Sequence, residues 1–189
     1  PRVSVDLDFD LLEETRKKEV FDEVKKIILQ FGTILDSKEK RYTIFFLLSY
    51  TKGEKKIKLE ISKRPTKSSY EVKSYLGIPV LVMKKEDMVA NKLLAFLTRS
   101  KFASRDLFDL WFFLKNDWQI NEEIVLEHTK LTLKENLEDA RNKIIKIKTS
   151  ALLHGLGEFV NEKQKVFIRN KLRDELLFNI KLYSETLKK

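Results

Sequence analysis

The hydrophobic period of this chain changes once, near Lys84, and that change limits the folds open to it. Before Lys84, apolar side chains recur at every second position in short runs, which is typical of β-strands with one buried face. After Lys84 they recur at every third or fourth position, which indicates amphipathic helices. The pattern predicts an α+β fold, with a small mixed β-sheet module over residues 1–83 followed by a C-terminal helical bundle over residues 84–189.

Both halves can be divided into elements. In the first half the pattern predicts one helix over residues 11–31 and an irregular stretch over residues 64–77. It predicts strands over residues 2–10, 41–50, 55–63 and 78–83. In the second half it predicts helices over residues 85–99, 105–115, 121–130, 132–148 and 161–187. Ser104 is a candidate N-cap, and the sequence from Thr132 to Glu135 is typical of a capping box.

Composition and charge narrow the function classes. The absence of Cys excludes disulfides, thiolate catalysis and Cys-ligated zinc, and it fits a cytoplasmic protein, as does the lack of an apolar run long enough to span a membrane. The formal charge of +9 favours a polyanionic partner such as nucleic acid over a merely Lys-rich surface. A basic run over residues 52–67, followed by Tyr70, could hold a phosphate backbone, although a solvated hairpin explains the run equally well.

The first strand carries the strongest candidate for a chemical site. Read with period two, its apolar side chains point to one face, while Asp6, Asp8 and Asp10 point to the other with Ser4. Neighbouring carboxylates repel each other unless a cation lies between them, and carboxylate oxygens are ligands that Mg²⁺ prefers. Asp6 and Asp8 are therefore candidate metal ligands, with an ordinary solvated acidic face as the alternative.

Glu60 is a third candidate acid. In the strand over residues 55–63 it shares a face with Lys58, opposite the apolar side chains. If this strand lies beside the first one, Glu60 could join Asp6 and Asp8 around the same ions. The alternative is a cross-strand ion pair between Glu60 and a lysine, which is common on sheets.

The helical half supplies further candidates. Lys92 lies in an apolar helix, where a lysine either extends to water or meets an anion such as a triphosphate. Asp106 lies in the first turn of a predicted helix, where the helix dipole favours an acid whether or not it has a chemical role. Arg105 is disfavoured at that end and is expected to need an acidic or phosphate partner; Asp109, one turn later, could be that partner.

Four short motifs occur in an order that is similar to that of a known family. They are Arg2–Phe9, Lys58–Ile61, Asp87–Ala95 followed by Arg99, and Arg105–Leu110, of which the last is the most specific. Together they span residues 2–115 and resemble the AbiEii/AbiGii nucleotidyltransferase toxins of the DNA polymerase β-like superfamily.

The resemblance implies a nucleotidyltransferase-like sheet module and a toxin of a toxin–antitoxin or phage-defence system. Such a toxin transfers a nucleoside monophosphate from a nucleoside triphosphate to an RNA, with the 3′ end of transfer RNA as one candidate acceptor, and its partner is a cognate antitoxin. The resemblance implies that Asp6 and Asp8 bind Mg²⁺, with Glu60 as a third acid, that Lys92 contacts the triphosphate and that Asp106 completes the active site. Ser4, where some relatives are inactivated by phosphorylation, and Arg105 complete the expected nucleotide-binding set.

The chain departs from the family pattern in one respect. Family members carry a Gly-Gly or Gly-Ser turn upstream of the aspartates, whereas this chain starts at Pro1, inside the first motif. We therefore expect the chain as given to be a fragment without full activity.

The leading hypothesis is a two-metal transfer. A metal-dependent nuclease and a catalytically inactive module that binds RNA or a protein partner are the alternatives.

Overall fold

The computed structural model describes residues 6–187 except residues 52, 55 and 66. It combines helices and small sheets, so the predicted α+β class is confirmed. Contacts within the chain divide it into an N-terminal unit that ends at residue 66 and a C-terminal unit that continues from residue 67. This division lies before the predicted boundary at residue 84, because the last hairpin belongs with the helices. The division into two domains at residue 84 stays a prediction.

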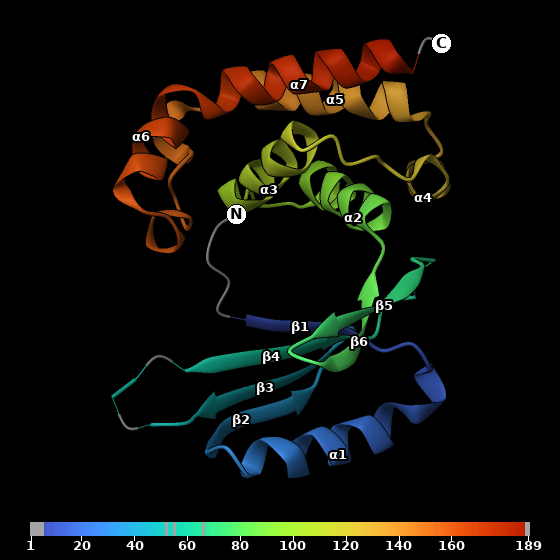
Figure 1. The fold of residues 1–189 in the computed structure, drawn as a ribbon, viewed down its shortest axis with the longest axis vertical. Coiled ribbons are helices and arrows are strands. Elements are labelled where there is room, and N and C mark those ends of the chain that lie inside the picture. Colours follow the sequence, from blue (N-terminus) through green and yellow to red (C-terminus); the bar gives the residue numbers. More distant parts are fainter. Residues whose placement is uncertain (1–5, 52, 55, 66, 188–189) are drawn as a thin grey trace. The chain divides into compact units, whose positions relative to one another are not determined.

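The N-terminal unit is a four-stranded mixed sheet with one helix along one face (Figure 1). In spatial order the strands are β1 (Asp6–Asp10), β4 (Ile57–Ser62), β3 (Thr43–Ser49) and β2 (Thr33–Glu39). The β1–β4 pair is parallel and the other two pairs are antiparallel. A short 3₁₀ turn at Glu14–Arg16 leads into the helix α1, Lys17–Leu29.

Alternation along β3 explains which face of the sheet α1 covers. Ile44, Phe46 and Leu48 are buried, whereas Phe45 and Leu47 lie between them on the opposite face and are only partly buried. The buried side chains form one cluster with Ile28 of α1 and with Leu59 and Ile61 of β4. This core holds the sheet and α1 together and leaves the other face of the sheet open to polar side chains.

The apolar side of β1 is buried less well than the sequence predicts. Leu7 and Phe9 are in register with Leu59 and Ile61 and so lie on the α1 face. They are nevertheless 47% and 51% exposed, because α1 does not extend over this edge of the sheet as it does over β3 and β4.

The C-terminal unit begins with an antiparallel hairpin and continues as helices (Figure 1). Its elements are β5 (Tyr70–Tyr75), β6 (Ile78–Met83), α2 (Lys85–Thr98), α3 (Ser104–Lys115), α4 (Glu122–Thr129), α5 (Leu133–Ile145), α6 (Glu162–Asn170) and α7 (Leu172–Thr186), with 3₁₀ turns at Thr149–Ala151 and Gly157–Phe159 between α5 and α6. No helix among the described residues is long and apolar enough to cross a membrane.

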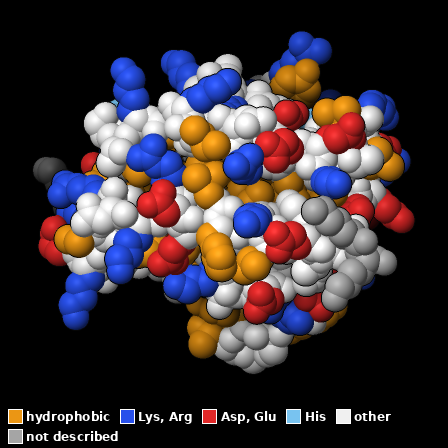
Figure 2. Space-filling model, turned by 90° about the horizontal axis from the view of Figure 1, so that it is seen from above, with side chains coloured by type: hydrophobic (Ala, Val, Ile, Leu, Met, Phe, Trp, Pro, Cys, Tyr) orange, Lys and Arg blue, Asp and Glu red, His pale blue; other side chains and the backbone are white. Residues whose placement is uncertain are grey.

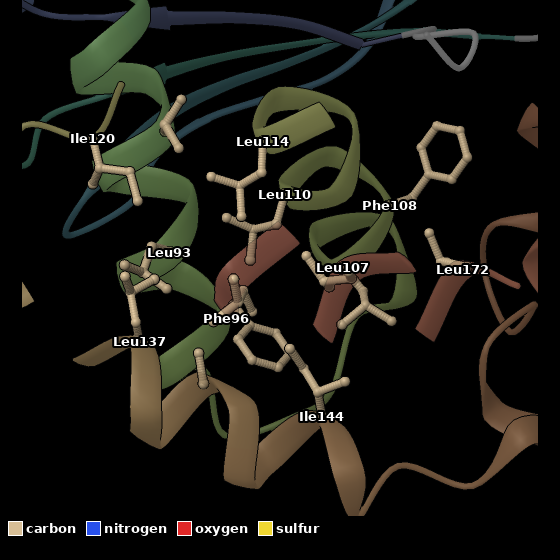
Figure 3. Packing of buried hydrophobic residues seen from close by; sticks show 14 of the residues in the cluster. Leu93, Phe96, Leu107, Phe108, Leu110, Leu114, Ile120, Leu137, Ile144 and Leu172 are labelled. Atoms are coloured by element: carbon tan, nitrogen blue, oxygen red, sulfur yellow. The ribbon is translucent and has the colours of Figure 1, made fainter. Parts of the chain in front are cut away.

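The core of the C-terminal unit forms where α2, α3 and α5 meet and where α7 packs on α3 and α5 (Figure 3). Phe96 of α2, Leu107 of α3 and Ile144 of α5 are buried in it, and Leu172 reaches it from α7. The predicted capping box at Thr132 and Glu135 is confirmed, and the Asn121 side chain caps α4. These caps fix where α4 and α5 begin.

Two strands were missing from the sequence-based prediction. Strand β2 has a bulge between Ile34 and Asp36, which interrupts the period-two pattern on which strand recognition depends. Strand β5 lies in the stretch predicted to be irregular. Most of its residues are exposed, so its sequence lacks an alternating apolar face.

Two helix predictions were also wrong in detail. The predicted helix over residues 161–187 is two helices, because the backbone of Lys171 leaves the helical region at φ −131°. The break lets Ile168 and Leu172 be buried on either side of it. Ser104 is the first residue of α3 and not its N-cap; its hydroxyl donates a hydrogen bond to the backbone carbonyl of His154.

A buried carboxylate ties the start of the β5–β6 hairpin to the helices. Asp87, in the first turn of α2, is 1% exposed and accepts hydrogen bonds from the backbone amide of Ser69 and from the Asn121 side chain. One turn later, Asn91 donates to the hydroxyl of Ser68 at 2.8 Å. Both contacts hold the segment that leads into β5 against α2.

We predict that Asp87→Ala destabilises the protein by about 2 kcal/mol, because the buried carboxylate of Asp87 is the acceptor of two partly buried hydrogen bonds. Urea unfolding followed by circular dichroism measures this change. Glu86→Ala is the matched control in the same helical turn and is expected to change stability by less than about 0.5 kcal/mol. Equal losses in both variants would contradict the structural role of Asp87.

Candidate active site

The parallel pairing of β1 and β4 brings the predicted acids together within the N-terminal unit. Asp6 is in register with Lys58, and Asp8 is in register with Glu60. Residues in register on adjacent strands have their side chains on the same face. The strand that carries Glu60 therefore lies beside β1, as the sequence argument required, and the three carboxylates share the face opposite α1.

Lys58 lies between two of these carboxylates. Its Nζ atom is 3.1 Å from Oε2 of Glu60 and 3.3 Å from Oδ2 of Asp6. Partial burial alone would lower the pKa of Lys58, but the hydrogen bonds and negative charges of Glu60 and Asp6 outweigh burial and raise it. The structure thus contains an ion pair between Glu60 and Lys58, which is the alternative interpretation of Glu60.

The donor chemistry of this cluster fits a hard divalent cation. Asp6, Asp8 and Glu60 offer only carboxylate oxygens, and an ammonium group already occupies the position of a cation between two of them. Within the described part of the chain, however, no three acidic or histidine side chains converge closely enough to hold a metal ion. Asp8 is exposed, and Ser4 lies outside the described residues.

A second charged cluster lies between α2 and α3 in the C-terminal unit. Lys92 of α2 is 3.2 Å from Oδ1 of Asp106 and 3.2 Å from Oδ2 of Asp109, both on α3. Arg99, at the end of α2, places its Nε atom 3.3 Å from the other oxygen of Asp106. Lys92 could extend to water or contact an anion. The structure shows that it contacts anions, and these are carboxylates of the protein.

Asp106 is the most deeply buried member of this cluster. Its side chain is 1% exposed, compared with 26% for Lys92 and 42% for Arg99. Arg99 is within ion-pair distance of Oδ2, but this oxygen has no hydrogen bond of good geometry from any described residue. One buried acceptor of Asp106 is therefore available to a further donor.

Sequence reasoning missed the pairing of Asp109 with Lys92. It considered Asp109 as a partner for Arg105, but no described carboxylate forms an ion pair with Arg105. Arg99 lies seven residues after Lys92, so the two share a face of α2, and Asp109 follows Asp106 by three residues on α3. These spacings are visible in the sequence, but the packing of α2 against α3 decides which charges meet.

The fold is similar to that of two solved structures. A protein from H. pylori that is assigned as a nucleotidyltransferase matches with 27% sequence identity and a TM-score of 0.64, over 99% of this chain and 80% of that chain. JHP933 from Helicobacter pylori shares the fold, with 22% identity and a TM-score of 0.53, over 99% of this chain and 81% of that chain.

The family model that matches the chain is that of the AbiEii nucleotidyl transferase toxin of type IV toxin–antitoxin systems, and it covers residues 1–180. The chain belongs to this family, which confirms the resemblance inferred from the four motifs. A comparison with curated protein sequences gives no match.

We predict that Asp106→Asn destabilises the protein by about 2 kcal/mol, because Lys92 and Arg99 lose their shared counter-charge. Removing one partner of a fully buried ion pair costs about 3–5 kcal/mol of stability. The loss here is expected to be smaller, since both cations remain partly solvated. Asp139→Asn, on the exposed face of α5, is the control and should leave stability unchanged within about 0.5 kcal/mol. Urea unfolding compares the two; equal stabilities would show that the α2–α3 ion pairs do not stabilise the bundle.

Proposed function

We propose that this protein transfers a nucleoside monophosphate from a nucleoside triphosphate to a hydroxyl group of an RNA, with the 3′ end of transfer RNA as one candidate acceptor. The observation that carries the proposal is the alignment of Asp8 with Glu60, next to Asp6, on adjacent parallel strands of a chain that belongs to a nucleotidyltransferase family. The proposal includes a cytoplasmic location and a cognate antitoxin as the partner in the toxin–antitoxin system.

In the proposed reaction the acceptor oxygen forms a bond to the α-phosphorus, and the bond between that phosphorus and the bridging oxygen breaks. Pyrophosphate leaves, and the proton of the hydroxyl passes to a carboxylate of the β1–β4 cluster. Asp6 and Asp8, with Glu60, would hold Mg²⁺, which when bound supplies charge neutralisation for the phosphates. Binding of a metal ion there requires Lys58 to move away from Asp6 or Glu60, because its ammonium now neutralises both.

Lys92 is proposed to contact the triphosphate, with Arg105 as a second cation. The two carboxylates beside Lys92 hold its ammonium in place before any substrate binds, which limits the reorganisation that the reaction requires. Asp106 acts in this scheme as the residue that positions Lys92. Phosphoryl transfer depends mainly on positioning and charge neutralisation, which is what such a set of groups provides.

We predict that Asp6→Asn abolishes transfer while the fold is retained, since a neutral amide neither holds a divalent cation well nor accepts the proton. The assay incubates the protein with total cellular RNA and each labelled nucleoside triphosphate in turn, with Mg²⁺ or with EDTA. Asp22→Asn, on the exposed side of α1, is the control and should retain wild-type labelling. Melting curves verify that both variants are folded.

The same assay distinguishes the proposed reaction from its alternatives. Transfer labels or lengthens the RNA and stops in EDTA, whereas a nuclease shortens it. Labelling by Asp6→Asn equal to that of the wild type would refute the role of the acidic cluster. RNA that is bound but neither labelled nor shortened would indicate an inactive binding module.

A further inference from the structure

An aromatic residue lies in the same transverse row of the sheet as the candidate acids. On the face opposite α1, Asp8 of β1 is in register with Glu60 of β4, Glu60 with Phe45 of β3, and Phe45 with Lys38 of β2. Adjacent strands lie about 4.8 Å apart. Phe45 is therefore one strand away from Glu60 and two strands away from Asp8, and its side chain is only partly buried.

Two ammonium groups lie close to the Phe45 ring. The Nζ atom of Lys40 is 4.5 Å from the ring centroid, and that of Lys38 is 5.8 Å away. Lys38 also pairs with the carboxylate of Asp36 at 2.7 Å. Lys40 has no carboxylate partner among the described residues, so its charge on this face is not compensated by an ion pair.

Tyr42, in the turn between β2 and β3, has a similar environment. The guanidinium carbons of Arg41 and Arg64 are 4.9 Å and 5.5 Å from its ring centroid. Its side chain is 45% exposed, and neither arginine forms an ion pair with a described carboxylate. This end of the sheet thus carries two aromatic rings that are each accompanied by two cations.

Among the described residues, the other aromatic rings that contact a cation each contact only one. On the face seen from the side of α5 and α7, Lys and Arg side chains are interspersed with Asp and Glu (Figure 2). Near Tyr42 and Phe45, three cations lack a carboxylate partner within the described ranges, and aromatic rings lie between them. Uncompensated cations attract phosphates, and accessible rings stack on bases.

We propose that Lys40, Arg41, Tyr42, Phe45 and Arg64, here called the aromatic–basic surface, bind single-stranded RNA. A strand fits better than a single nucleotide because the surface offers two rings with separate pairs of cations, which suits consecutive nucleotides. The row from Phe45 through Glu60 to Asp8 then leads the strand toward the acids. The assignment of this RNA as the acceptor rests on the proposed function, whereas the binding itself does not.

The test measures binding of a fluorescein-labelled 12-nucleotide single-stranded RNA by anisotropy, over a series of salt concentrations and in EDTA. The double variant Arg41→Gln with Arg64→Gln should lower the slope of log K against log salt by about 1.4, since each phosphate contact on a single strand contributes about 0.7. Tyr42→Ala and Phe45→Ala should each weaken binding by about tenfold, the size expected for one lost stacking contact.

The control double variant, Arg169→Gln with Lys181→Gln, removes the same charge from exposed positions of α6 and α7 and should leave the slope unchanged. An equal change of slope in both double variants would overturn the proposal, because binding would then follow net charge alone. Tyr42→Ala, in an exposed turn, keeps the test valid if Phe45→Ala fails to fold. If the variants of the aromatic–basic surface lose binding to a fluorescent nucleoside triphosphate while their RNA binding is unchanged, the surface binds the triphosphate. That result would also overturn the proposal.

The binding test and the transfer test can fail separately. Asp6→Asn should bind the RNA as the wild type does in EDTA, because the acids are not part of the aromatic–basic surface. If the slopes change as expected and no triphosphate labels RNA, the surface is supported and the proposed function fails. If labelling occurs and the slopes do not depend on Arg41 and Arg64, the surface is refuted and the proposed function remains.

Discussion

The parallel pairing of β1 with β4 is the interaction on which the acidic cluster depends. Its register is set by apolar contacts on the α1 face, where Leu7 lies beside Leu59 and Phe9 beside Ile61. Because side chains alternate between faces, a shift of one residue would move Glu60 to the apolar face and away from Asp8. Hydrophobic packing on one side of the sheet thus positions carboxylates on the other side.

The sequence predicts most of this fold because its strongest patterns are local. The alternation that buries Ile44, Phe46 and Leu48, and the capping box at Thr132, can be read without knowledge of tertiary structure. Strand β2 could not be predicted, since its bulge breaks the alternation, and the break at Lys171 depends on how α6 and α7 pack.

The candidate site follows the same division between local and tertiary information. The faces to which Asp6, Asp8 and Glu60 point could be predicted from period two alone, because strand geometry fixes them, but the pairing of β4 with β1 could not. The contacts of Lys58 and Lys92 could not, since a lysine side chain is long and reaches several neighbours. The structure shows that each of these lysines lies between two carboxylates, and this arrangement implies that an incoming phosphate or metal ion must compete with charges of the protein itself.

The position of β1 at the end of the strand order has one more consequence. One side of this strand has no hydrogen-bonded neighbour among the described strands, and such an edge can pair with the same edge of another molecule. Asp8, which is exposed, adds a negative charge to this strand beyond the ion pair of Asp6 with Lys58, so two copies brought edge to edge would repel each other. The acids that are candidates for chemistry thus also discourage self-association, and substitutions that neutralise several of them at once would favour aggregation even where the fold is intact.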